Sequence, residues 1–264
     1  HYIAILEELG AVEPGIALTV AAHNSLCTNH IFLFGSEEVK QRWLPGLASG
    51  KVVGAWGLTE PEAGSDSGAT KTTAVRNDKG WVLNGSKNFI THAGCGGIVV
   101  AMARTTPGKD HHGISAFAIP LTTPGVTVGK HEDKVGMRIS DTTALIFEDC
   151  QVGPEALCGK EGDGFIQAME ILDGGRISIA ALSVGIAKGA LDAAVAYAKQ
   201  RRQFGKPLAA FQAIRFKLAD MATQYEAARL LTVEAADAKD AGRKTTLISS
   251  QAKLYASEVA VHVA

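Results

Sequence analysis

The stretch "GLTEPEAGSDSG", residues 57–68, combines glycines, carboxylates and hydroxyl side chains between two apolar runs. Glycine lets a ligand approach the backbone closely, and free backbone N–H groups bind phosphate oxygens. The stretch lacks the GK[ST] ending of a P-loop and the GxGxxG spacing of a dinucleotide fold. It is no nucleophile elbow either, because Asp66 stands where that motif needs serine. A solvated linker is the alternative, but a linker gives no reason for Trp56 and Leu58 at its entrance.

A pair of glycines, Gly174 and Gly175, interrupts a helical pattern in "LDGGRISIAAL". Each glycine costs a helix roughly 1 kcal/mol relative to alanine, so the pair requires a reason. Close approach of a ligand beside Asp173 and Arg176 is one reason, and close helix packing is the alternative.

Two further segments carry aromatic or basic residues. "KNFIT" follows the hairpin signal Asn84–Gly85, which predicts a strand with Phe89 and Thr91 on one face and Ile90 on the other. The segment "RRQFG", residues 201–205, predicts the end of a helix, with two cations at its C-terminus and a glycine cap.

The histidines do not predict a metal site. His111 and His112 are adjacent in a turn, which we expect to point their rings apart, and His23 and His30 lie seven residues apart in a helical zone. Solvated or hydrogen-bonded histidines explain these positions better than a chelate. We therefore expect no metal.

The elements that must position these residues fall into three zones. Residues 2–50 have helical apolar spacing, with Ser36 as a predicted N-cap. Residues 51–152 contain short β-rich runs separated by Gly- and Pro-containing turns, and from residue 164 onward the pattern is helical again. A doubly wound parallel sheet needs alternating strands and helices, so this order excludes it. The predicted strands are WVLNGSKNFIT, GIVVAMAR, ISAFAIPL and TTALIFEDCQV.

Composition narrows the class of protein. The 264 residues carry 26 Lys and Arg against 27 Asp and Glu, which gives a net charge of −1 and no electrostatic footprint for nucleic acid. The four cysteines form no CxxC pair, which favours free thiols in a reducing compartment. We expect no membrane span and no signal peptide. The chain begins inside a helical pattern, so we expect a fragment.

These motifs together resemble the acyl-CoA dehydrogenase family, and its short-chain, butyryl-type branch in particular. The resemblance rests on "GLTEPEAGSDSG", "NGSKNFIT", "FEDCQVG", "GDGFIQAMEILDGGRISIAA" and "YAKQRRQFGKPLAAFQ", which occur in the family's order. It implies an α+β fold with an N-terminal helical part in residues 1–50, a central antiparallel β domain in residues 51–155 and an incomplete C-terminal helical bundle in residues 156–264.

The resemblance also implies FAD as the cofactor. Thr59 would hydrogen-bond the polar edge of the flavin, and Phe89 stands where the family usually has tryptophan. Arg201 would reach the FAD pyrophosphate of a neighbouring subunit, so a homo-oligomer is implied, commonly a tetramer. The positions that match cofactor-binding residues are Trp56, Leu58, Thr59, Gly64, Ser65, Phe89, Ile90, Thr91, Arg201, Phe204 and Gln212.

For the substrate, the resemblance implies an acyl-CoA thioester contacted by Ser65, Asp173 and Arg176. The reaction would remove an α-proton and a β-hydride to give a trans-2-enoyl-CoA, with electrons passing to electron-transferring flavoprotein. The compartment would be the cytoplasm in a bacterium or the mitochondrial matrix in a eukaryote.

The catalytic base is the part of the family pattern that this chain lacks. The family places its glutamate immediately before the arginine of "LDGGR" or in a later segment. Gly175 occupies the first site, and Asp173 points about 200° away around the helix. We therefore expect the base beyond Ala264. Two other classes stay open, namely a flavin oxidase or monooxygenase of the nitroalkane-oxidase kind and a noncatalytic FAD-binding assembly protein.

Overall fold

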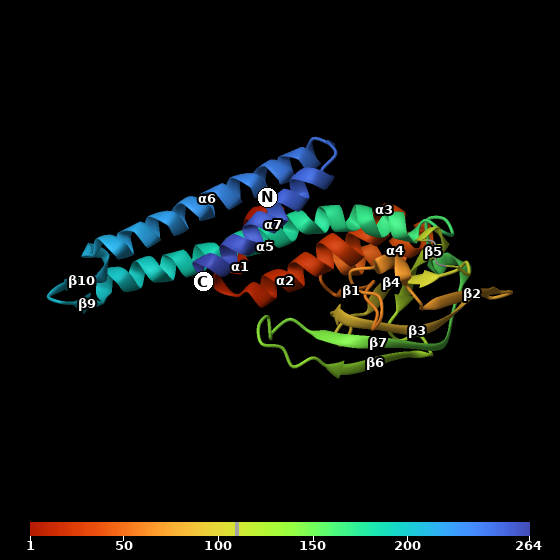
Figure 1. The fold of residues 1–264 in the computed structure, drawn as a ribbon. Coiled ribbons are helices and arrows are strands. Elements are labelled where there is room, and N and C mark those ends of the chain that lie inside the picture. The colour runs from red at the N-terminus through yellow and green to blue at the C-terminus, as the bar shows by residue number, and fades with distance from the viewer. Residues whose placement is uncertain (109–110) are drawn as a thin grey trace. The chain divides into compact units, whose positions relative to one another are not determined.

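The computed structural model describes residues 1–108 and 111–264 (Figure 1). The chain divides into two compact units. One comprises residues 22–172, and the other comprises residues 1–21 and 173–264. We call them the sheet unit and the helical unit.

The sheet unit is built on an eight-stranded sheet in the order β6-β7-β3-β2-β4-β5-β8, with β1 paired to β4. Most pairs are antiparallel, as predicted, but β1 runs parallel to β4, and Thr73 of β2 pairs in parallel with Arg104 of β4. The sheet is therefore mixed. The strands are β1 (Gly54–Gly57), β2 (Thr73–Asn77), β3 (Gly80–Thr91), β4 (Ile98–Arg104), β5 (Ile114–Pro120), β6 (Val126–His131), β7 (Thr142–Val152) and β8 (Leu157–Cys158).

Strand β3 corrects one prediction. The β2–β3 hairpin turns at residues 78–79, because Asn77 pairs with Gly80. Asn84–Gly85 is not a hairpin turn but lies inside β3, where the register with β7 shifts and Gly85 has φ +143°. A glycine that interrupts a strand marks such an irregularity as readily as a turn.

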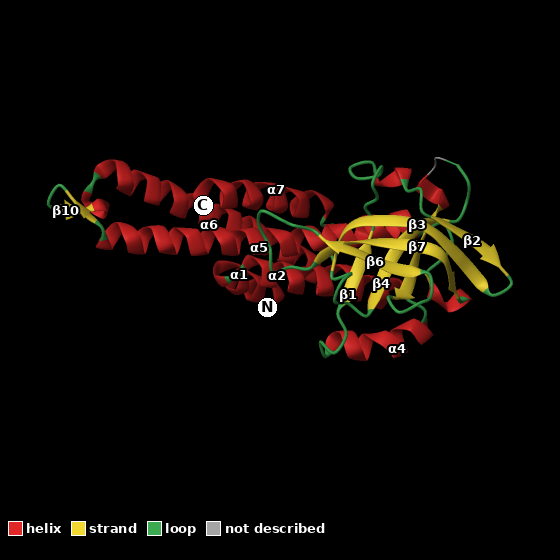
Figure 2. Cartoon of the chain, turned by 90° about the horizontal axis from the view of Figure 1, so that it is seen from below, coloured by secondary structure: helices red, strands yellow, loops and turns green. Residues whose placement is uncertain are grey.

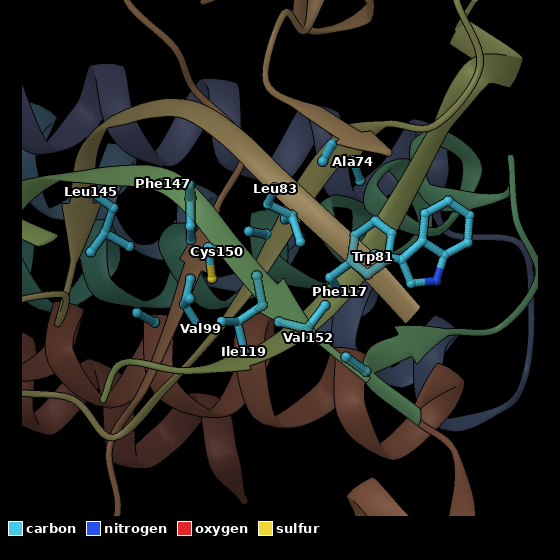
Figure 3. Packing of buried hydrophobic residues seen from close by; sticks show 14 of the residues in the cluster. Ala74, Trp81, Leu83, Val99, Phe117, Ile119, Leu145, Phe147, Cys150 and Val152 are labelled. Carbon is cyan, nitrogen blue, oxygen red and sulfur yellow. The ribbon is translucent and has the colours of Figure 1, made fainter. Parts of the chain in front are cut away.

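The sequence of strand β4 is a continuous apolar run because both faces of the strand are buried. Val99, Ala101 and Ala103 point into a core that includes Trp81 and Phe117, whose rings meet edge to face at 5.4 Å (Figure 3). The alternate residues of β4 point into a second core formed with helical segments. A strand buried on both sides reads as a continuous apolar run.

The helical segments of the sheet unit contribute to this second core. Ser36 caps α4 as predicted, since its Oγ accepts a hydrogen bond from Val39 N at 3.3 Å. The segments are the π-helix η1 (His23–Thr28), α3 (Asn29–Phe34), α4 (Glu37–Ala48) and three short 3₁₀ turns, η2 (Ser67–Ala69), η3 (His111–Gly113) and η4 (Pro154–Ala156).

The helical unit consists mainly of helices (Figure 2). Alanines make up much of its buried core. A Cβ on Gly185 would lie 2.9 Å from Gly10 Cα, so the two glycines let α1 and α5 approach closely. Its elements are α1 (Tyr2–Val12), most of α2 (Pro14–Ala22), α5 (Gly164–Gln200) from Asp173 onward, β9 (Arg202–Gln203), β10 (Lys206–Pro207), η5 (Leu208–Ala210), α6 (Gln212–Asp240) and α7 (Thr246–Val263).

Helix α5 ends at Gln200, directly before the two arginines, as predicted, but the predicted glycine cap at Gly205 is wrong. Residues 202–207 form a two-stranded hairpin whose turn holds Phe204 and Gly205, both with positive φ. The glycine therefore serves a turn and not a helix cap. By length and composition alone α5 could cross a membrane, but Ile177, Ala180 and Val184 on it are buried in the bundle core, which accounts for its apolar character.

Candidate cofactor and substrate site

A cavity of about 220 Å³ lies in the sheet unit, where β1, the loop after it and the end of β3 come together. We call it the β1–β3 cavity. It unites six predicted cofactor residues from two segments about thirty residues apart. Its lining consists of Ala22, Leu26, Gly54, Trp56, Leu58, Thr59, Phe89, Ile90, Thr91 and Leu172.

The end of β3 has an irregular backbone that shapes this cavity. Phe89 has φ +58° and His92 has φ +68°, and the register with β7 shifts between Lys87 and Ile90. The predicted alternation is therefore wrong, since Phe89, Ile90 and Thr91 all line the cavity. Positive φ at a bulky residue costs free energy and is found mostly where surrounding structure or function imposes it.

Two threonine hydroxyls are available at the cavity. Within residues 1–108 and 111–264, neither Thr59 Oγ1 nor Thr91 Oγ1 forms a hydrogen bond, although both residues line the cavity. The Thr59 carbonyl accepts a hydrogen bond from Asn88 N at 2.9 Å, which ties the loop to β3. Apolar walls with two hydroxyls suit a flat ring system with polar atoms at its edge.

A buried ion pair between Lys87 and Glu60 holds the loop after β1 in place. The Lys87 side chain is fully buried, and its Nζ donates hydrogen bonds to Glu60 Oε1 at 2.6 Å and to the Leu58 carbonyl at 3.2 Å. Glu60 also accepts hydrogen bonds from Lys71 N at 2.6 Å and Thr72 N at 3.1 Å. The pair thus connects the loop to β3 and to the start of β2.

Burial and the pair act on the two pKa values in different ways. Burial lowers the pKa of Lys87 to about 8, although Glu60 opposes the shift. Burial alone would raise the pKa of Glu60, but the Lys87 ammonium and the hydrogen bonds outweigh it and lower that pKa. The sequence analysis did not predict this pair. A lysine among the apolar residues of a strand could have indicated it, because a buried lysine is almost always paired.

Two histidines are hydrogen-bonded, as predicted for His23 and His30. His23 contacts Leu47 O at 3.0 Å and Gly54 N at 3.1 Å. His30 contacts Gln167 Oε1 at 3.0 Å, and Trp56 Nε1 donates to its Nδ1 at 3.1 Å. Their contact with the cavity lining was not predicted.

Ser65 lies outside the β1–β3 cavity, in a larger hollow of about 750 Å³. Arg104 shapes this hollow by donating to the Gly68 and Thr70 carbonyls at 2.9 Å each. Gly64 lines neither space. The hollow is lined by Ser65, Asp66, Ser67, Gly68, Ala69, Thr70, Lys71, Arg104, Gly108, His111 and Phe165.

The adjacent histidines at this hollow correct another prediction. The ring centroids of His111 and His112 lie 4.1 Å apart, so the rings do not point apart. His111 also lies 5.0 Å from the ring of Phe165. In the described part of the chain, no group of three or more His, Cys, Asp or Glu residues could hold a metal ion.

The predicted substrate residues on α5 contact each other. Arg176 forms an ion pair with Asp173 Oδ1, and Thr246 Oγ1 donates to Asp173 Oδ2 at 2.7 Å, which links α5 to α7. A Cβ on Gly174 would meet Nζ of Lys239 on α6, but this atom is the end of a flexible side chain that can move aside, so packing within the helical unit does not require this glycine.

The remaining predicted cofactor residues lie at the hairpin between α5 and α6. Arg201 and Gln212 are exposed, and Phe204 is 91% exposed. The Phe204 ring meets Phe211 edge to face at 6.2 Å. These side chains are therefore accessible on the helical unit.

Three family models match the chain in sequence order. The acyl-CoA dehydrogenase N-terminal domain matches residues 1–51, the middle domain residues 55–150 and the C-terminal domain residues 162–264. The middle-domain match contains the predicted residues of the β1–β3 cavity.

Individual proteins give the same assignment. The short-chain specific acyl-CoA dehydrogenase of Megasphaera elsdenii is 49% identical over 263 residues, which cover 99% of this chain and 69% of that protein. A chain in a structure described as the electron transferring flavoprotein of Acidaminococcus fermentans is 50% identical, with a TM-score of 0.97 over 99% of this chain and 69% of its own.

A chain in the structure of the FAD complex of PigA is 32% identical, with a TM-score of 0.94 over 99% of this chain and 69% of its own. The predicted family and fold class are confirmed by the three domain models and by these similarities. The chain belongs to the acyl-CoA dehydrogenase family.

Proposed function

We propose that this protein is an FAD-dependent dehydrogenase that converts a short-chain acyl-CoA thioester to a trans-2-enoyl-CoA. The β1–β3 cavity carries the proposal, because its apolar walls and two available hydroxyls fit a flavin ring. The 49% identity to a short-chain specific acyl-CoA dehydrogenase supports the substrate class.

The β1–β3 cavity fits part of a cofactor. Its volume of about 220 Å³ is below the roughly 300–1,000 Å³ of sites that enclose a whole ligand. Trp56, Leu58 and Phe89 would contact the ring faces, and Thr59 and Thr91 would bond its polar edge. Bound FAD supplies the hydride acceptor for the substrate β-carbon.

Other predicted residues would hold the rest of the cofactor. Ser65 and the neighbouring Gly64 would contact the phosphate region, with backbone N–H groups as donors. Arg201, Phe204 and Gln212 would contact FAD of a neighbouring subunit, which their exposure permits. The protein would then be a homo-oligomer, with a tetramer as the family's common state.

The substrate would contact Ser65, Asp173 and Arg176. The Asp173–Arg176 ion pair fixes the guanidinium on α5, so Arg176 would present a positioned cation to an anionic or carbonyl group of acyl-CoA. The α-proton of a thioester is weakly acidic and requires a carboxylate base. No carboxylate is among the residues that line the β1–β3 cavity in the described part of the chain.

We therefore place the base outside these 264 residues, since Gly175 occupies the family's alternative site. FAD-loaded protein limited to these residues should bind butyryl-CoA without flavin reduction, and Gly175→Glu should restore part of it. Reduction by the unsubstituted 264-residue protein would show that a carboxylate within it is the base.

Anaerobic titration of the full-length protein with butyryl-CoA tests the function. A dehydrogenase loses the absorbance of its oxidised flavin and regains it on addition of electron-transferring flavoprotein, the acceptor that we propose. Peroxide release with a substrate that is not a CoA thioester would indicate an oxidase. Flavin that no substrate reduces would indicate a binding protein.

A further inference from the structure

We propose that His30, fixed by Gln167, is a positioning residue that sets the orientation of the Trp56 indole at the β1–β3 cavity. The inference rests on the proposed function in one respect, namely that Trp56 contacts the flavin. The hydrogen-bond geometry itself belongs to the chain and does not depend on a cofactor.

The hydrogen bonds from Trp56 through His30 and Gln167 to Cys158 fix which atom donates and which accepts in each bond. An indole N–H can only donate, so His30 Nδ1 accepts the bond from Trp56 Nε1 at 3.1 Å. The His30 proton is then on Nε2, which donates to Gln167 Oε1 at 3.0 Å. The Gln167 amide nitrogen in turn donates to the Cys158 carbonyl at 3.0 Å, so the glutamine cannot flip without loss of both bonds.

His23 has the same protonation state at the start of β1, with Nδ1 as acceptor and Nε2 as donor. His23 Nδ1 accepts from Gly54 N at 3.1 Å, so its Nε2 carries the proton and donates to the Leu47 carbonyl at 3.0 Å. His92 Nδ1 donates to the Gly54 carbonyl at 3.0 Å. Gly54 and Trp56, which both line the cavity, are thus attached to side chains of three different segments.

The environment keeps His30 in the required state. Its side chain is fully buried, with the Phe34 ring edge to face at 5.3 Å. Burial lowers its pKa to about 4, so the ring is neutral near pH 7 and its Nδ1 lone pair is available to the indole. An apolar residue at position 30 would leave the Trp56 N–H without this acceptor.

The experiment compares His30→Leu, which removes the acceptor, with His30→Asn, whose amide oxygen replaces it. His262→Leu is the control, because His262 is exposed and belongs to the helical unit. The first measurement is hydrogen exchange of the three ¹⁵N-labelled indoles of Trp43, Trp56 and Trp81 in protein without cofactor. Trp→Phe variants assign the signals.

We expect His30→Leu to speed exchange of the Trp56 indole by about fivefold, which corresponds to the net contribution of one hydrogen bond. Trp81, buried in the other core, should be unchanged, and His30→Asn should restore slow exchange. Unchanged Trp56 exchange in His30→Leu would overturn the inference and leave the proposed function intact.

The second measurement is the FAD dissociation constant of the same variants in the full-length protein. We expect it to rise about tenfold in His30→Leu and to rise little in His30→Asn. In Trp56→Phe, which has no donor, His30→Leu should add little. If exchange responds but FAD affinity and the flavin spectrum do not, Trp56 is no flavin contact, and that part of the proposed function fails.

Discussion

The loop that follows β1 and the hairpin that joins α5 to α6 both carry predicted cofactor residues, but the chain holds them differently. Behind the loop lie the buried Lys87–Glu60 pair and the His30 network, so Trp56, Leu58 and Thr59 have fixed surroundings. At the hairpin, Phe204 is 91% exposed. Buried side chains therefore hold the first region, whereas the predicted cofactor residues of the second are exposed.

The largest expected effect concerns the buried pair. Lys87→Met leaves the Glu60 carboxylate buried without its charge partner, so the free energy of unfolding should fall by about 3–5 kcal/mol. Lys87→Met combined with Glu60→Gln should recover part of this loss, because no uncompensated charge then remains.

Urea denaturation measures both variants. The exposed Arg243–Glu234 pair, with an N–O distance of 3.1 Å, is the control, and Arg243→Ala should cost under about 1 kcal/mol. Equal losses in Lys87→Met and Arg243→Ala would contradict the claim that the buried pair holds the loop.

The next effect is the pH dependence that His30 contributes. Its folded pKa of about 4 lies below the ordinary 6.5, so the unfolded chain binds the extra proton between these values. The stabilisation is present above pH 6.5 and is lost as the pH falls toward 4, by about 3 kcal/mol. Denaturation of wild type and His30→Asn at pH 7 and pH 4.5 should show a steeper loss for wild type, and parallel losses would contradict this.

The third prediction compares how substitutions in the loop and in the hairpin affect FAD binding. Thr59→Val should weaken FAD binding about tenfold through loss of one hydrogen bond. Arg201→Ala should also weaken FAD binding, but only where subunits associate. Isothermal titration at several protein concentrations distinguishes the two, and undiminished FAD occupancy of the double mutant after dialysis would remove both assignments.

The smallest expected effect on stability belongs to Arg176. Its pair with Asp173 is partly exposed and spans three residues of one helix, so Arg176→Ala should cost under about 0.5 kcal/mol. Activity with butyryl-CoA should fall by far more, at least about tenfold. An active but less stable variant would make Arg176 structural.

Much of the fold could be predicted from local sequence patterns. All four strands that the β-rich runs predict exist, as β3, β4, β5 and β7, and Ser36 caps α4. The short strands β1 and β8 carry no pattern of their own, because their pairing depends on β4 and β5. Propensity and period describe a segment, whereas pairing depends on the rest of the sheet.

The site was predicted less evenly. Six of the residues predicted from the motifs line one cavity, but the positive φ of Phe89 follows from a register shift against β7, which no local pattern reveals. Gln167 lies 137 residues from His30, so their hydrogen bond could not be read from sequence spacing. The predicted glycine cap was wrong because residues 202–207 pair as a hairpin, and a glycine with positive φ suits a turn as well as a helix cap.

The most direct test of the central claim is an FAD titration of full-length protein with ¹⁵N-labelled tryptophan indoles. If the flavin lies in the β1–β3 cavity, the Trp56 signal should shift and saturate with bound FAD, while the signal of Trp81, buried in the other core, stays in place. FAD that binds stoichiometrically and leaves the Trp56 signal unchanged would contradict the account.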